Sequence, residues 1–370
     1  MDFTLGEELL AVRDLAAEIF ADRATAQRVR EVEESESRVD GALWSELTRA
    51  GLLGVALPEP DGGAGLGLGA LCVLLTEQGR TVAPVPVWPA VAGALAVAEH
   101  GTPEQRATVV AGTAEGSVRL TVALEEFGPA DPERPSCLAT PDGDAWRLTG
   151  TKAVVPSAFG ADHVLVAAST ERGTGLFLVP SAGTGVGTER VETTSHDAAA
   201  NLTLDGAAAK AVGEPGNGVL EWTLRQVSTA VAAVQLGVAE GALAHAANYL
   251  RDRAQFGRPL GSFQAVQHQL ADCYIDIDAM RVTLWRAVTA LADGDPAADR
   301  AVRVAHWWAG DAGLTVVHRV QHVHGGIGVD VDYPVHRHFL WGRQLAGTLG
   351  GAAATLACLG DVLAEQEVTA

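Results

Sequence analysis

The sequence is short of cysteine and of positive charge. Its four cysteines lie far apart, so no close pair suggests a zinc site or a disulfide framework. We expect small buried side chains in a reducing compartment. Lysine and arginine number 26 against 46 aspartates and glutamates, a net charge of −20. Such a field repels phosphates and anionic lipid headgroups, which argues against nucleic acid or membrane as a partner. The cysteines are Cys72, Cys137, Cys273 and Cys358.

Signals for export or membrane insertion are also missing. The first ten residues, MDFTLGEELL, lack the basic start and apolar run of a signal peptide. The alanine-rich stretch 228–247 is interrupted by Gln235, Glu240 and His245 before about 20 apolar residues accumulate. We therefore expect a cytoplasmic protein.

The sequence is rich in apolar residues. Of its 370 residues 48% are hydrophobic, which is enough for a sizeable core. Up to about residue 118 the apolar spacing predicts helices, near 9–20, 41–50, 70–78 and 90–100. The segment 57–69, rich in glycine and proline, is expected to be a loop. Thr102 is expected to cap the next helix, with Pro103 at its first position.

Short β-rich runs follow, among them VRLTVAL, AWRLTG, HVLVAAS, GLFLVP and NLTLDG. Such runs, separated by turn residues, predict a β-sandwich or barrel. From 262 to 293 apolar residues recur every three or four positions, which predicts a helix of roughly 30 residues, typical of bundles. The fold class is therefore α+β. We expect an N-terminal helical domain over 1–118, a central β domain over 119–212 and a C-terminal helical bundle domain over 213–370.

Two C-terminal segments, RAQFGRPLGSFQAVQHQLAD (253–272) and QHVHGGIGVDVDYPVHR (321–337), resemble the acyl-CoA dehydrogenase family. The segments MDFTLGEE at the start, GLLGVALPEPDGGAG (51–65) and LTGTKAVVPSAFGADHVLVA (148–167) agree with it. The resemblance implies a C-terminal four-helix bundle. It also implies a flavin enzyme that removes hydrogens from the α- and β-carbons of an acyl-CoA, with a carboxylate taking the α-proton and FAD the hydride.

In that family, one conserved set of residues contacts the ADP portion of a neighbouring subunit's FAD. An arginine offers its guanidinium to the pyrophosphate, and a glycine lets the backbone approach closely. The plainer interpretation is a solvated helix arginine and a glycine that ends a helix. The resemblance assigns these cofactor contacts to Arg253, Gln255, Phe256, Gln321 and Gly325.

The positions for a flavin of the chain's own depart from the family pattern. The family's catalytic glutamate, fifteen residues after the proline of its YPVER-like motif, is replaced by Leu349. The other known position falls near Val227-Ser228, where neither residue is acidic. The threonine and serine of the flavin-binding loop are Leu124 and Ala130, and the family's Trp-Ile-Thr segment reads VVP over 154–156. The sequence therefore assigns no catalytic residue.

The same division is known in actinobacterial heteromeric acyl-CoA dehydrogenases, which are α2β2 tetramers used on sterol side chains. The resemblance implies that this chain is their glutamate-lacking subunit, which completes the FAD site of a glutamate-bearing partner. It further implies an acyl-CoA substrate and an electron-transfer flavoprotein as electron acceptor. Sterol, polyketide and branched-chain acyl groups all fit the sequence.

Two other interpretations stay open. The chain could be a self-sufficient homo-oligomeric dehydrogenase whose base is Glu125, Glu126 or Glu240, or a non-enzymatic relic of the fold that binds something else. Histidines between 318 and 338, with His318 and His322 spaced i, i+4, raise the question of zinc. No carboxylate or cysteine completes a set at the usual spacing, so we expect no metal.

Overall fold

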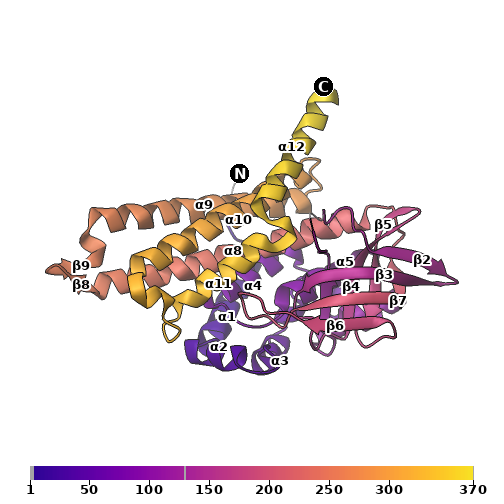
Figure 1. Cartoon of the computed structure of the whole chain (residues 1–370), viewed down its shortest axis with the longest axis horizontal. Coiled ribbons are helices and arrows are strands. Elements are labelled where there is room, and N and C mark those ends of the chain that lie inside the picture. Colours follow the sequence, from indigo (N-terminus) through magenta and orange to yellow (C-terminus); the bar gives the residue numbers. More distant parts are fainter. Residues whose placement is uncertain (1–3, 129–130, 370) are drawn as a thin grey trace. The chain divides into compact units, whose positions relative to one another are not determined.

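The computed structural model describes residues 4–128 and 131–369 (Figure 1). Contacts within the chain divide it into two compact units. One comprises Met1–Ala26, Cys72–Ala83 and Val231–Ala370, and the other comprises Gln27–Leu71 and Pro84–Ala230. Along the sequence, helices are followed by strands and then by helices again, which confirms the expected fold class. The domain boundaries at 118 and 212 stay predictions.

Helices fill the first part of the chain. The cap expected at Thr102 is present as a capping box with Gln105. Helix α2 is not indicated by the pattern, because only Val29 and Val32 of its eight residues are buried. Helix α4 begins at Gly67, inside the segment expected to be a loop. The helices are α1 (Glu7–Arg23), α2 (Ala26–Glu33), α3 (Gly41–Arg49), α4 (Gly67–Thr81), α5 (Val87–His100), α6 (Pro103–Gln105) and α7 (Ala111–Ala114).

Seven strands form one sheet that closes on itself. Strand β4 pairs with β2 on one side and with β5 on the other, and β3 and β7 complete the ring between them. This closed order decides between the sandwich and the barrel in favour of a barrel. Strands β2 and β6 are short and mostly exposed, so the sequence pattern does not indicate them. The strands are β1 (Leu120–Ala123), β2 (Leu138–Asp142), β3 (Ala145–Val155), β4 (His163–Thr170), β5 (Gly173–Pro180), β6 (Val186–Arg190) and β7 (Ala200–Val212).

A buried cluster holds the barrel together. Along β7, buried Leu202 and Leu204 alternate with more exposed neighbours, as in a strand with one face toward a core. The rings of Trp146 and Phe177 meet edge to face with centroids 5.2 Å apart. Burial of apolar side chains in this cluster supplies most of the stabilisation of the sheet.

The C-terminal part is helical (Figure 1). Helix α9 confirms the long helix expected over 262–293. Helices α10 and α12 are joined by a buried hydrogen bond of 2.9 Å between Nδ1 of His306 and the hydroxyl of Thr355. The elements are α8 (Val219–Asp252), β8 (Ala254–Gln255), β9 (Arg258–Pro259), α9 (Gln264–Ala292), α10 (Ala298–His324), α11 (Val335–Gly347) and α12 (Gly351–Thr369).

Two helical stretches, 219–252 and 335–364, are long and apolar enough to cross a membrane by length and composition alone. In the first, 78% of the most apolar window is buried inside the protein, as in the core helix of a globular protein. The second stretch, 22% buried, is not one straight helix, because Leu349, Gly350 and Gly351 have positive φ and separate α11 from α12.

Candidate functional site

A tight hairpin follows α8 and carries two of the predicted cofactor contacts, with a third, Arg253, directly before it. Gln255 in β8 pairs with Arg258 in β9, which leaves Phe256 and Gly257 as the two turn residues. Both have positive φ, 54° and 79°, as a two-residue type I′ turn requires. Phenylalanine is strained in that region, and this ring is 88% exposed. Strain and an exposed apolar ring at one position indicate a functional constraint rather than a packing role.

Arg253 lies between α8 and the hairpin with an exposed side chain. Its backbone is fixed, since its amide donates to the carbonyl of Tyr249 at 2.9 Å and its carbonyl accepts from Leu260 at 2.8 Å. Within residues 4–128 and 131–364, its guanidinium has no hydrogen bond or ion pair. The neighbouring guanidinium of Arg258 lies over the ring of Phe263, 4.0 Å from its centroid.

The other two predicted contacts lie at the end of α10. Gly325 has φ 65° and ψ −142°, a conformation that essentially only glycine adopts, and it ends the helix. Around the positions where Cβ atoms of Gly325 and Gly326 would stand, there is open space. The side-chain amide of Gln321 donates to the carbonyl of Gly328 at 3.2 Å, so it holds its own loop in place.

Three aromatic rings connect these two loops. The sequence pattern does not predict them as a site. Tyr249 stacks on His324 with centroids 4.8 Å apart and planes 19° apart. Tyr333 lies 5.4 Å from His324 and 6.1 Å from Tyr249. We call Tyr249, His324 and Tyr333 the ring cluster. Its sequence signal is weak: one aromatic residue lies four positions before Arg253 and another follows the glycine turn.

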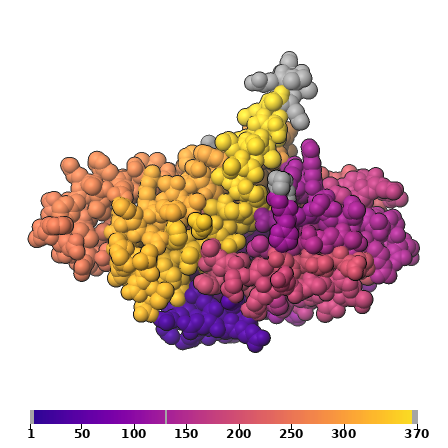
Figure 2. Space-filling model, in the orientation of Figure 1, coloured from indigo at the N-terminus to yellow at the C-terminus, as the bar shows by residue number. Residues whose placement is uncertain are grey.

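The site fits the ADP portion of FAD in its chemistry. A pyrophosphate needs cationic and N–H donors on a surface that it can approach. Directly before the hairpin, Arg253 offers a guanidinium without a partner in the described parts of the chain, and the loop offers backbone without side chains at Gly325 and Gly326. Figure 1 shows β8 and β9 at one end of their unit, and Figure 2 shows the orange surface of the same segment open on the face in view.

At the position of the family's catalytic glutamate, Leu349 is buried with 9% exposure and has φ 55° and ψ 39°. Left-handed backbone at a leucine is strained, yet here it makes the turn between α11 and α12. A leucine side chain has no group that accepts a proton. That no catalytic base stands at this residue stays a prediction from the sequence.

In the other unit, the loop that the resemblance assigns to flavin binding is held by a buried ion pair. Lys152, with no exposed side-chain surface, donates to Glu126 at 2.6 Å. The same carboxylate accepts from the amides of Ser136 and Cys137. Burial favours a high pKa for Glu126, but the hydrogen bonds and charge of Lys152 and its other donors outweigh it and lower the pKa to about 2. Glu126 is therefore ionised at neutral pH.

The segment that replaces Trp-Ile-Thr is also engaged within the chain. The amide of Val154 donates to the side-chain oxygen of Asn201 at 3.1 Å, and the hydroxyl of Thr121 donates to the carbonyl of Pro156. Val155 and Leu124 are buried. The side chains of Leu124 and of the segment 154–156 have no hydroxyl to offer to a flavin. The remaining replacement, at Ala130, lies outside the described residues.

Two of the three carboxylates considered as alternative bases, Glu240 and Glu126, lie in ion pairs. Glu240 is 12% exposed and accepts from Arg80 at 2.6 Å and Arg281 at 2.7 Å. Glu126 is bound by Lys152 as described. Their geometry is that of structural ion pairs.

The histidines between 318 and 338 are spread over different environments. His318 packs edge to face on Phe339, His324 belongs to the ring cluster, and Nε2 of His338 lies 3.0 Å from the carbonyl of Arg80. In the described parts of the chain, no three histidine, cysteine or acidic side chains are grouped so that they could hold a metal ion.

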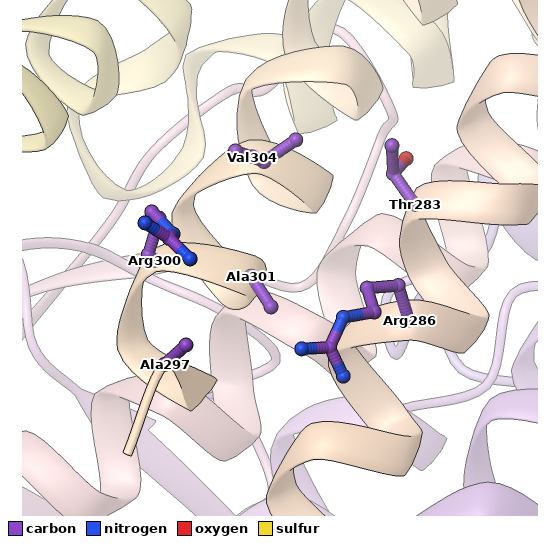
Figure 3. A pocket seen from close by; sticks show the side chains of 6 residues that line it. All are labelled: Thr283, Arg286, Ala297, Arg300, Ala301 and Val304. Atoms are coloured by element: carbon purple, nitrogen blue, oxygen red, sulfur yellow. The ribbon is translucent and has the colours of Figure 1, made fainter. Parts of the chain in front are cut away.

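Two cavities lie away from these predicted contacts. One, of about 180 Å³, is lined by Arg286 and Thr283 of α9 and by Arg300 and Val304 of α10 (Figure 3). Arg286 is already paired with Asp295 at 2.7 Å. The other, of about 360 Å³, lies against β3, β4, β5 and β7 and has the ion pair of Lys210 and Glu104 on its wall.

Comparison with known proteins gives the family. A model of the acyl-CoA dehydrogenase N-terminal domain matches residues 6–117, and one of the C-terminal domain matches 215–356. The acyl-CoA dehydrogenase FadE27 of Mycobacterium tuberculosis is 39% identical over 377 residues, 99% of each chain. A solved variant of the Tcur3481-Tcur3483 steroid ACAD shares 64% identity, with a TM-score of 0.96 over 99% of this chain and 100% of that one. The ChsE4-ChsE5 complex from Mycobacterium tuberculosis shares 40%, with a TM-score of 0.93 over 99% of each. The chain therefore belongs to the acyl-CoA dehydrogenase family of FAD-dependent oxidoreductases.

Proposed function

We propose that this chain is the glutamate-lacking subunit of a heteromeric acyl-CoA dehydrogenase and completes the FAD site of a glutamate-bearing partner. The observation that carries the proposal is a contrast between two places in the chain. The guanidinium of Arg253, which has no partner among the described residues, and the bare backbone at Gly325 are available to a cofactor. At the position of the base stands the buried Leu349.

The solved relatives support a two-component assembly. The names of two of them pair two components, as Tcur3481-Tcur3483 and as a ChsE4-ChsE5 complex, and the first is called a steroid ACAD. For this chain we infer the same kind of assembly, with an acyl-CoA as substrate, a sterol side chain as the acyl group these names favour, and an electron-transfer flavoprotein as acceptor.

The residues of this chain would bind the ADP portion of the cofactor, away from the flavin ring. Arg253 would pair with the pyrophosphate, Gln255 and Phe256 would contact the adenosine side, and the loop at Gly325, supported by Gln321, would approach with its backbone. When bound, the flavin in this family accepts a hydride from the substrate's β-carbon. The proton acceptor for the α-carbon would come from the partner.

The test is co-expression with a glutamate-bearing dehydrogenase of the same source, followed by a flavin spectrum of the purified complex. We expect the complex to be yellow and active, and this chain alone to be nearly colourless. Arg253→Ala should weaken FAD binding about tenfold or more while thermal unfolding of the isolated chain stays unchanged. The control is Arg251→Ala, because Arg251 is exposed and, among the described residues, pairs only with its neighbour Asp252.

A chain that binds one FAD and oxidises acyl-CoA without any partner would contradict the proposal. So would an Arg253→Ala complex with unchanged flavin affinity. Leu349→Glu should create no activity in the isolated chain, because Leu124 and the segment 154–156 still lack flavin-binding hydroxyls.

A further inference from the structure

We propose that the ring cluster positions the two loops for the cofactor, so that Tyr249, His324 and Tyr333 are positioning residues. This inference rests on the proposed function, because it takes the hairpin at 254–259 and the loop at 325–329 as the FAD-facing loops. It goes beyond that function by assigning roles to three residues that contact neither substrate nor cofactor in the proposal.

The orientation of His324 is fixed from both sides of its ring. Nδ1 lies 2.7 Å from the carbonyl of Val320 and must carry the proton, since a carbonyl can only accept. Nε2 is then the acceptor, and the hydroxyl of Tyr333 lies 3.5 Å from it. His324 is 4% exposed. The imidazole therefore holds one tautomer and one plane, against which Tyr249 stacks.

Two of the rings, Tyr249 and His324, lie close to the loops along the backbone. Tyr249 accepts the hydrogen bond from the amide of Arg253, one helical turn later, and Arg253 closes the hairpin by accepting from Leu260. His324 immediately precedes Gly325. Contact between Tyr249 and His324 thus fixes the end of α8 relative to the end of α10 within one compact unit.

The loops themselves have little that could set this spacing. Residues 251–259 are all exposed, and added Cβ atoms at Gly257, Gly325 and Gly326 would have no atom within 4 Å. Each loop has internal hydrogen bonds, such as that of Gln321 to Gly328, but these act within one loop. To bind one pyrophosphate from two sides, the two loops need a fixed spacing, because misplaced donors lose much of their binding energy.

The experiment measures the effect of the rings on loop order separately from their effect on cofactor binding. Tyr249→Leu removes the stacking, Tyr249→Phe keeps the ring, and Tyr333→Phe removes only the hydroxyl. The matched control is Phe339→Leu, which removes a ring contact with His318 at the same 4.8 Å spacing, here between α10 and α11. Amide hydrogen exchange of the isolated chain reports on loop order without flavin, and FAD release from the purified complex reports on binding.

We expect Tyr249→Leu to speed exchange in 254–259 and 325–329 about fivefold and to speed FAD release by a similar factor. Tyr333→Phe should have a smaller effect of the same kind. Tyr249→Phe should restore both readouts, and Phe339→Leu should leave both loops unchanged. Unchanged loop exchange in Tyr249→Leu, or equal loosening in Phe339→Leu, would overturn the positioning role.

Failure of the proposed function gives a different result. Loops that loosen in Tyr249→Leu while FAD release stays constant would contradict cofactor binding by these loops, and with it this inference. Arg253→Ala provides the reference for a contact residue, since it should release FAD without changing loop exchange.

Discussion

Lys152 and Glu126 form the most buried ion pair among those described, with side-chain exposures of 0% and 6%. They tie the loop after β1 to β3, in the segment that the resemblance assigns to flavin binding. Two charges removed from water must compensate each other, and removal of one leaves the other without a partner. The pair therefore stabilises the loop without contributing a catalytic group.

We predict that Lys152→Met lowers the free energy of unfolding by about 3 kcal/mol, because it leaves Glu126 charged and buried. Urea denaturation of the isolated chain measures this change. The control is Arg147→Met, whose pair with Asp142 is about half exposed on both sides and should contribute less than about 1 kcal/mol. Equal losses in the two variants would show that burial of the pair does not matter.

At the scale of elements, the crossing of α4 and α8 depends on two glycines. A Cβ at Gly79 would overlap the carbonyl of Val234, and one at Gly237 would overlap the carbonyl of Thr76. The hydroxyl of Thr76 adds a hydrogen bond across the crossing to Ala233. The two helices are therefore in backbone contact, which holds this part of α8 in the core of the unit that contains Val231–Ala370.

Gly237→Ala should destabilise the chain by about 2 to 3 kcal/mol, since the methyl group has only backbone to displace. Gly41→Ala provides the comparison, because no atom lies within 4 Å of its added Cβ and its φ is not positive. Thermal unfolding should show a clear decrease in Tm for the first variant and none for the second. A fall of the same size in both would rule out the crossing as the cause.

At the scale of the whole molecule, the chain buries several neutral histidines. Burial lowers the pKa of His306 and of His338 to about 4, with smaller contributions from Arg303 and His245 respectively. The unfolded chain binds protons at these residues below about pH 6.5, whereas the folded chain does not. Their contribution to stability is therefore complete above pH 6.5 and falls as the pH drops toward 4.

We expect the free energy of unfolding to fall between pH 7 and pH 5 by about 1 to 2 kcal/mol for each of the two histidines. Urea midpoints at a series of pH values measure it, and His306→Gln should flatten the slope. His322→Gln, at an exposed position, should keep the slope of the parent chain. A stability that is constant from pH 7 to pH 5 would contradict the expectation.

Secondary-structure elements with a periodic or local sequence pattern were predictable, and elements without such a pattern were not. The apolar repeat of α9 and the capping box at Thr102 depend on neighbours in sequence, so the pattern was sufficient. Helix α2 and strands β2 and β6 bury too few residues to show a period. Among the site residues, Arg253 and Gly325 came from motifs, but the ring cluster escaped because its members lie 75 and 9 positions apart.

The sequence by itself determined the family and the fold class, and it predicts the missing base, since a leucine at 349 cannot accept a proton in any conformation. Although positive charge is scarce in the sequence, the guanidinium of one cation, Arg253, has no partner among the described residues. Only the tertiary structure decided that the sheet closes into a barrel, that Glu240 and Glu126 are bound by cations, and that three distant rings join two loops. Strand order and contacts between distant residues depend on packing in three dimensions, which sequence spacing does not record.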